Sequence, residues 1–293
     1  MPITVLSSIA ETRAHLAKCR TSKTGPIILV PTMGALHEGH AQLVRAGRER
    51  AGKDGTVIVS VFVNPTQFGP NEDLEAYPRS LEHDEQICEA CGANVIFAPN
   101  GAEMYAPDHS IDVRETTLSV GLCGTSRPGH FPGVCLVVMK LIGIVQPTQA
   151  VFGKKDYQQL AVIRRLVRDL NVPIDIVAVD TVREEDGLAM SSRNENLSKA
   201  ERKAAPGIQS ALLAGKKQWE KSPDITPNVL VRLVRSRLEQ VQGGRVDYVE
   251  LLDAETLESV QMIDKPVVMA TAMFFSKARL IDNIEFGPER SEG

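Results

Sequence analysis

The sequence is poor in aromatic residues and cysteine, and it contains no apolar run long enough to cross a membrane. Only 4% of the 293 residues are Phe, Trp or Tyr. The longest apolar stretch, residues 133–145, is interrupted by Lys140 and falls short of the ~20 residues of a membrane helix, so it predicts a buried helix. The five cysteines are an odd and scattered set, which favours a reducing cytoplasm over a disulfide framework. Cys88 and Cys91 have no second pair nearby and are expected to pack in the core.

Other absences narrow the function. The net charge of -4 and the pI near 5.9 argue against a dedicated nucleic-acid binder and point to small substrates. The sequence contains neither the GxxxxGK[ST] motif of a P-loop nor the GxGxxG motif of a dinucleotide fold. Its first residues show no basic segment followed by an apolar one, so no secretory signal is expected. A polar tail, residues 287–293, is expected to be disordered.

The length and the periodicity predict two domains, residues 1–180 and 181–293. In the first, strands alternate with helices, which predicts a Rossmann-like, doubly wound parallel sheet with ligands at the carboxyl ends of its strands. In the second, two helical segments precede three strands, which predicts a smaller α+β domain that serves as a lid. The predicted strands are 27–30, 56–63, 94–98, 111–114, 149–152, 174–179, 246–252, 267–275 and 278–284, and the longer predicted helices are 41–50, 156–171, 199–221 and 226–242.

The most informative segment is PTMGALHEGH, residues 31–40, where an apolar strand leads into a helix. Imidazoles at a helix start can donate hydrogen bonds to phosphate oxygens, and the backbone amides of that helix start face the same side. His37 and His40 are therefore predicted to bind phosphate. The same spacing also suits two metal ligands or two surface histidines, although the further ligands of a zinc site are not evident nearby.

Three more polar clusters follow predicted strands or join the two domains. Residues 64–70 bring the amides of Asn64 and Gln67, which can bind a small polar molecule or simply belong to a Pro/Gly turn. Residues 153–159 place two lysines at a helix start, where an anion would offset their unfavourable interaction with the helix dipole, unless they are merely solvated. Residues 190–193 supply two hydroxyls and a guanidinium that can bind phosphate oxygens.

These four clusters and two further segments occur in order at compatible spacing over most of the chain. The six segments are residues 31–40, 63–68, 77–79, 127–131, 152–160 and 190–193. Any one of them is weak evidence, but together they resemble the pantoate–β-alanine ligase (pantothenate synthetase) family.

The resemblance implies a homodimeric, cytoplasmic, Mg²⁺-dependent ligase of the HxGH nucleotidyltransferase superfamily. Pantoate attacks ATP to give pantoyl adenylate and pyrophosphate, and β-alanine then displaces AMP to form pantothenate. The implied catalytic residues are His37, His40, Lys155 and Arg193, with His40 as the proton donor. The implied ATP site comprises Met33, Gly34, Ala35, Leu36, His37, Glu38, Gly39, His40, Gly153, Lys154, Lys155, Asp156, Val182, Met190, Ser191, Ser192 and Arg193, while Asn64, Gln67 and Gln159 would hold pantoate.

Two positions depart from the family pattern, and two other functions compete with this interpretation. Lys154 stands where the family commonly has glutamate, and His83 precedes Asp84 where relatives often have paired acidic residues; Asp84 is the expected metal contact. One alternative is an adenylyltransferase of the same superfamily that acts on a phosphorylated cofactor precursor. The other is a nucleotide-sensing protein without turnover, against which the cluster of His40 and Lys155 argues.

Overall fold

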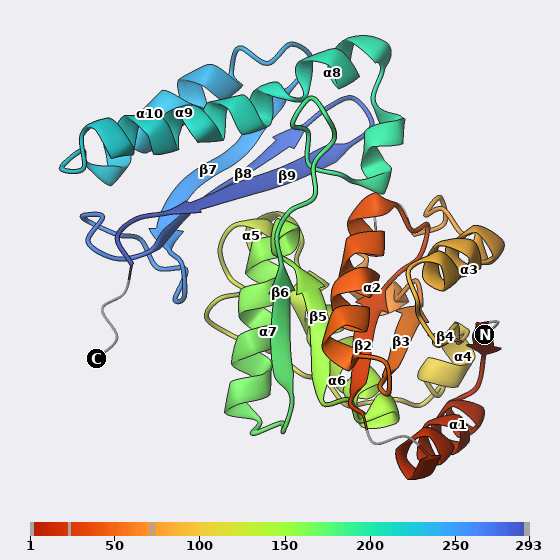
Figure 1. The fold of residues 1–293 in the computed structure, drawn as a ribbon. Helices are drawn as coiled ribbons and strands as arrows, with labels where there is room; N and C mark the ends of the chain where they lie inside the picture. Colours follow the sequence, from red (N-terminus) through yellow and green to blue (C-terminus); the bar gives the residue numbers. More distant parts are fainter. Residues whose placement is uncertain (1–2, 23–24, 71, 73, 290–293) are drawn as a thin grey trace. The chain divides into compact units, whose positions relative to one another are not determined.

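A computed structural model describes residues 3–22, 25–70, 72 and 74–289 of the chain (Figure 1). The chain folds into two compact units. Unit 1 is Met1–Lys154 with Gln159–Asp180, and unit 2 is Lys155–Gln158 with Thr181–Gly293. The short segment Lys155–Gln158 therefore groups with unit 2, although both of its flanking segments belong to unit 1. Each unit has its own sheet and its own apolar core.

Unit 1 is built on a parallel six-stranded sheet in the order β1-β4-β3-β2-β5-β6. Most of its strands are buried apolar runs, as expected when helices cover both faces. This arrangement confirms the predicted doubly wound α/β fold. The strands are β1 (Thr4–Leu6), β2 (Ile27–Thr32), β3 (Thr56–Val61), β4 (Val95–Phe97), β5 (Gln149–Gly153) and β6 (Asp175–Val179).

The helices of unit 1 lie on two sides of this sheet. Helices α2 and α3 contact each other and β3, whereas α1 and α6 contact each other, and α6 also contacts β2. Cys88, in α3, and Cys91, at the end of α3, are buried in the apolar core of unit 1, which confirms their predicted packing role. The helices are α1 (Ile9–Ser22), α2 (Glu38–Ala51), α3 (Leu81–Ala90), α4 (Gly101–Met104), α5 (Cys123–Ser126), α6 (His130–Val145) and α7 (Tyr157–Asp169), with 3-10 turns η1 (Pro65–Gln67) and η2 (Lys154–Asp156). The residues of η2 and α7 that fall within Lys155–Gln158 belong to unit 2.

The carboxyl ends of β2 and β5 mark the point where the strand order of the sheet reverses. From β2 the chain continues through α2 to β3 on one side, and from β5 it continues through α7 to β6 on the other. Ligands of open α/β sheets bind outside the strand ends at such a switch point. The segment after β2 is the predicted histidine motif, and the segment after β5 carries the predicted lysines.

Unit 2 packs helices against an antiparallel sheet in the order β7-β8-β9. Figure 1 shows α9 and α10 lying along the sheet, and both helices contribute to its apolar core. The elements are η3 (Ser192–Asn196), α8 (Lys199–Ala204), α9 (Gly207–Lys221), α10 (Pro227–Leu238), β7 (Arg245–Asp253), β8 (Val267–Phe274) and β9 (Arg279–Phe286).

Three sequence-based predictions of elements need correction. The predicted strand 111–114 is wrong: these residues pair with no strand in the described part of the chain, and Ile111 is 74% exposed. The predicted helix 199–221 is two helices, because Pro206 lacks the amide needed to continue α8. The sequence does not predict strand β1, since three residues give too short a pattern. The predicted disordered tail lies partly in residues 290–293, outside the described residues.

No helix in the described part of the chain combines the length and the apolar composition that crossing a bilayer requires.

Candidate active site

The loop between β2 and α2 has a backbone that a buried carboxylate holds in place. Gly34 and Ala35 both have positive φ angles, +87° and +47°, which is costly for the alanine. The backbone amide of Leu36 donates to Asp84 Oδ1 at 2.7 Å. A Cβ added at Gly34 would lie 2.8 Å from Val61 Cγ1 and 2.9 Å from Asp84 Oδ2, so only glycine fits there. Asp84 thus fixes the loop that carries the histidines.

His37 and His40 form a reciprocal cap at the start of α2. His37 Nδ1 accepts a hydrogen bond from the Gly39 amide at 3.1 Å, and His40 Nδ1 accepts one from the His37 amide at 3.3 Å. The ring centroids are 4.1 Å apart. Because Nδ1 is the acceptor in each ring, the proton of each neutral imidazole lies on Nε2. The pair therefore presents Nε2–H donors at a helix N-terminus, an arrangement suited to an anion.

Asn64 and Gln67 follow β3 and are buried together. Asn64 Nδ2 donates to Gln67 Oε1 and to the Gly133 carbonyl, both at 3.1 Å. Asn64 Oδ1 accepts from the hydroxyls of Tyr105 at 2.8 Å and Thr66 at 2.9 Å. The backbone amide of Thr66 also donates to Asn64 Oδ1 at 3.3 Å, so these hydrogen bonds use the full capacity of the Asn64 side-chain amide. Asn64 therefore orients the Gln67 side chain through the hydrogen bond to its Oε1.

Gln67 connects this cluster to the histidine loop. Its Nε2 lies 3.1 Å from Met33 Sδ, a weak acceptor, while His130 Nδ1 lies 2.9 Å from its backbone carbonyl. Arg127 contacts His130 and forms a two-point ion pair with Glu72. Sequence reasoning assigns no role to His130, although the resemblance includes its segment, and it misses Tyr105, which no local motif distinguishes.

Three further predicted residues of unit 1 lie at the end of β5 or the start of α7: Gly153, Lys154 and Gln159. Lys154 forms an ion pair with Asp180 at 2.9 Å between Nζ and Oδ1. Gly153 ends β5 and is partly exposed. Gln159 lies in the first turn of α7 and is also partly buried. The carboxylate of Asp180 therefore gives Lys154 a partner of opposite charge within unit 1.

In unit 2, the charge of Lys155 interacts with that of Arg193, which belongs to the predicted phosphate-binding residues 190–193. Burial lowers the pKa of Lys155, Asp156 and Asp282 oppose that effect, and the positive charge of Arg193 adds to it. Two cations that repel each other in a partly buried site favour the binding of an anion between them, because the anion offsets their repulsion. The structure attaches both cations to the same strand: Asn283 of β9 donates to the Lys155 carbonyl at 3.0 Å, and η3, which contains Arg193, contacts β9, although 37 intervening positions separate Lys155 from Arg193 in the sequence.

The segment between residues 181 and 198 is folded back on itself within unit 2. Arg183 and Ala189 form an isolated antiparallel bridge, and the Met190 amide donates to the Val182 carbonyl at 3.0 Å. Ser191 caps η3 by accepting from the Arg193 amide at 3.2 Å. The structure therefore places Val182 and Met190, which are predicted to contact the adenine, next to each other. Ser191, Ser192 and Arg193 follow Met190 directly in the sequence.

The described residues contain no group of three or more His, Cys, Asp and Glu side chains that could bind a metal by themselves. The predicted metal contact, Asp84, is buried, and burial raises its pKa while the amides of Leu36 and Ala35 act in the opposite direction. Its Oδ2 has no hydrogen-bond partner among the described residues. One carboxylate oxygen fits a Mg²⁺ ion that takes most of its ligands from phosphates and water.

Known proteins of a single family match nearly the whole chain. The model of the family described as pantoate-beta-alanine ligase matches residues 4–285. The pantothenate synthetase of Akkermansia muciniphila is 47% identical over 279 residues, covering 95% of this chain and 98% of the relative. That of Geobacter sulfurreducens is 48% identical over 292 residues, covering 98% and 99%.

Solved structures agree as well. A crystal structure of pantothenate synthetase from Thermus thermophilus has a TM-score of 0.91 at 42% identity and covers 98% of this chain and 100% of its own. The Francisella tularensis pantoate-beta-alanine ligase, solved with beta-gamma ATP and beta-alanine, has a TM-score of 0.75 at 32% identity, with 96% and 97% coverage. On these matches, the chain belongs to the pantoate–β-alanine ligase family.

Proposed function

We propose that the protein condenses (R)-pantoate with β-alanine at the expense of ATP, giving pantothenate, AMP and pyrophosphate. The observation that carries this proposal is the histidine pair at the start of α2, at the switch point of the sheet. The Nδ1 atoms of both rings accept backbone amides of the helix start, which leaves each Nε2 to carry the proton and act as a donor. The family match over residues 4–285 supports it. The complex of the Francisella tularensis relative with an ATP-type ligand and beta-alanine supports two of the substrates.

In the first half-reaction, a carboxylate oxygen of pantoate attacks the α-phosphorus of ATP and the bond to pyrophosphate breaks. The nucleophile is ionised at neutral pH, so this step needs charge neutralisation more than a general base. His37, His40 and Lys155 are assigned to the phosphates, with His40 also as proton donor. Ser191, Ser192 and Arg193 are assigned to the β- and γ-phosphates, where Arg193 can donate two parallel hydrogen bonds.

In the second half-reaction, the amine of β-alanine attacks the acyl carbon of pantoyl adenylate. The C–N bond forms, the bond from that carbon to the phosphate oxygen breaks, and AMP leaves while the amine proton passes to solvent. Gln67, oriented by Asn64, is assigned with Gln159 to pantoate. On the nucleoside side, Gly153 and Asp156 are assigned to the ribose, and Val182 and Met190 to the adenine.

Mg²⁺ is proposed as the cofactor that accompanies the phosphates of ATP. When bound, it would neutralise charge on the leaving pyrophosphate. Asp84 is the residue proposed to contact it, through the Oδ2 atom that has no hydrogen-bond partner among the described residues. Because Oδ1 already accepts the Leu36 amide, the same carboxylate would connect the metal to the histidine loop.

A homodimer in the cytoplasm is the proposed physiological form. The five cysteines all lie in the described part of the chain and form no disulfide there, which is compatible with a reducing compartment. We assign the contact between subunits to the long segment before α5, where Ile111 is 74% and Val120 64% exposed. Sedimentation at micromolar concentration should therefore give twice the chain mass of 31.9 kDa.

The decisive experiment mixes the protein with Mg-ATP, (R)-pantoate and β-alanine and detects pantothenate by mass spectrometry. We expect pantothenate and AMP in equal amounts, and continuous AMP release only when β-alanine is present. The alternative, an adenylyltransferase acting on a phosphorylated cofactor precursor, would instead release pyrophosphate with that precursor and ignore β-alanine. Absence of pantothenate under these conditions would refute the proposed function.

A further inference from the structure

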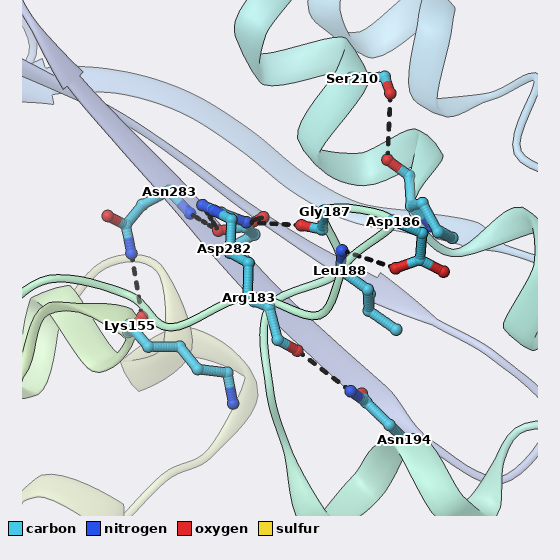
Figure 2. Close-up of polar contacts among 11 residues, drawn as sticks. Lys155, Arg183, Asp186, Gly187, Leu188, Asn194, Ser210, Asp282 and Asn283 are labelled. Carbon is cyan, nitrogen blue, oxygen red and sulfur yellow. Dashed lines mark hydrogen bonds and ion pairs between the residues drawn. The ribbon is translucent and has the colours of Figure 1, made fainter. Parts of the chain in front are cut away.

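Strand β9 holds the backbone of the predicted phosphate-binding lysine. Asn283 Nδ2 donates a hydrogen bond to the Lys155 carbonyl at 3.0 Å, although 127 intervening positions separate the two residues. Figure 2 shows the Asn283 amide directed at this carbonyl, while the lysine side chain extends away from it. Asn283 is buried and Lys155 is partly buried, so this hydrogen bond is partly protected from water. The contact thus fixes the point from which the lysine side chain departs.

Asn283 is itself fixed by its neighbour. Asp282 Oδ1 accepts a hydrogen bond from the backbone amide of Asn283 at 2.8 Å. The same carboxylate forms a two-point ion pair with Arg183 at 2.8 and 2.9 Å. Asp282 is 4% exposed, and Arg183 also donates to the Gly187 carbonyl at 3.1 Å (Figure 2). A two-point arginine–carboxylate pair restricts both orientation and distance. Residues 282 and 283 of β9 therefore hold two segments at once, Lys155–Gln158 through Asn283 and Thr181–Ser198 through Asp282, and η3 of the second segment also contacts β9.

A second contact holds the same short segment. The Tyr157 hydroxyl lies 2.9 Å from both the Ala254 carbonyl and Glu285 Oε1. Lys155–Gln158 thus groups with unit 2, whereas Lys154 and Gln159 on either side group with unit 1. The chain places the lysine directly after β5, but its tertiary contacts attach it to the sheet of the C-terminal unit.

We propose that Asn283 is a positioning residue that holds Lys155 beside Arg193, so that the lysine and the 190–193 loop form one preassembled anion-binding group within unit 2. This inference rests on the proposed function, because the anion it concerns is the polyphosphate of ATP. Preassembly matters because each cation repels the other until the anion arrives, and the scaffold must hold both against that repulsion. Loss of the Asn283 hydrogen bond should let the Lys155 ammonium move away from Arg193.

A double-mutant cycle tests whether Asn283 acts through Lys155. Asn283→Ala should lower kcat for pantothenate about tenfold and raise KM for ATP, while KM for β-alanine changes less than twofold. In a Lys155→Ala background, already slowed at least 100-fold, Asn283→Ala should cause no further loss. Equal losses in both backgrounds would overturn the proposal, as would unchanged kinetics of a folded Asn283→Ala variant.

A control variant and a measurement without turnover separate this role from general destabilisation. Ser276→Ala removes a hydroxyl donor to Glu201 in the turn between β8 and β9, so it should lower Tm without changing kcat. Asn283→Asp, which keeps the size but loses the donor, serves if the alanine variant does not fold.

The measurement without turnover is amine acylation followed by mass spectrometry. In apo protein, Asn283→Ala or Asn283→Asp should increase labelling of Lys155 at least threefold relative to Lys265, and unchanged labelling would overturn the proposal. If the wild type makes no pantothenate, the proposed function fails instead, and the labelling result still decides whether Asn283 positions Lys155.

Discussion

At the residue scale, the two groups with the clearest chemical assignment are His40 and Lys155. His40→Ala and Lys155→Ala should each slow adenylate formation by at least ~10²-fold, because each removes preorganised charge stabilisation from the phosphates. Single-turnover formation of pantoyl adenylate measures this directly. His15→Ala is the matched control, since His15 lies on α1, outside the predicted site. Near-normal single-turnover rates in either site variant would contradict the assignment.

Gln67 should distinguish pantoate from ATP. Its amide is oriented by Asn64 and lies in a buried cluster, so truncation would leave a polar group of pantoate unpaired. We expect Gln67→Ala to weaken pantoate binding by ~1–3 kcal/mol and to leave ATP binding nearly unchanged. Calorimetric titration of each substrate separates the two effects. Equal weakening of pantoate and ATP would mean that Gln67 is only structural.

Asp84 should link the metal to the histidine loop. Asp84→Asn keeps the shape of the side chain but removes the charge, so we expect the Mg²⁺ concentration for half-maximal rate to rise about tenfold or more. The rate at saturating Mg²⁺ should also fall, because the amide reproduces only one of the two acceptor oxygens. A lower rate with an unchanged Mg²⁺ requirement would show that Asp84 acts on the loop alone.

At the element scale, Asp253 stabilises the turn at the end of β7. Its buried carboxylate accepts the amides of Glu255 and Thr256 and pairs with Lys265 at 2.7 Å. Burial alone would raise the pKa of Asp253, but the Lys265 contact and the two amides outweigh it and lower the pKa to about 2. The folded pKa thus lies below the unfolded value, so the stabilisation is present above pH ~4 and is lost as the pH falls toward 2.

Replacing this carboxylate should therefore flatten the acid limb of the stability curve. Asp253→Asn should lower the free energy of unfolding at pH 7 and reduce the loss between pH 4 and pH 2 relative to wild type. Urea unfolding at a series of pH values measures both. Asp224→Asn, at an exposed position, is the control and should change neither quantity. An unaltered acid limb in Asp253→Asn would contradict the role of this carboxylate.

The elements also show where periodicity misleads. Residues 111–114 alternate apolar and polar side chains as a strand does, but a strand is defined by partners for its amides and carbonyls, and this segment pairs with no strand in the described chain. The pattern reports side-chain alternation and says nothing about backbone pairing. By contrast, β2 and the start of α2 are predictable, because burial, glycine placement and capping all occur within a few residues of one another.

At the scale of the whole molecule, we expect the segment Thr181–Ser198 to respond to nucleotide. ATP with Mg²⁺ should slow hydrogen exchange over residues 187–196, whereas β-alanine alone, which has no phosphate, should have little effect. Arg193→Ala should abolish most of this protection and leave the Tm of the apo protein almost unchanged, because a partly exposed arginine contributes little to stability. Protection by ATP that survives in Arg193→Ala would mean that another group orders the segment.

The α/β class, the histidine motif and the family follow from the amino-acid sequence alone, because they depend on local periodicity, glycine positions and ordered motifs. The residues that support the site are visible only in the folded chain. Asp84 under the histidine loop, Tyr105 behind Asn64, and Asn283 on the Lys155 carbonyl are contacts between residues that lie 41 to 128 positions apart. Such contacts leave no trace in local patterns, because hydrogen-bond geometry depends on how distant strands and helices pack and not on the spacing of residues along the chain.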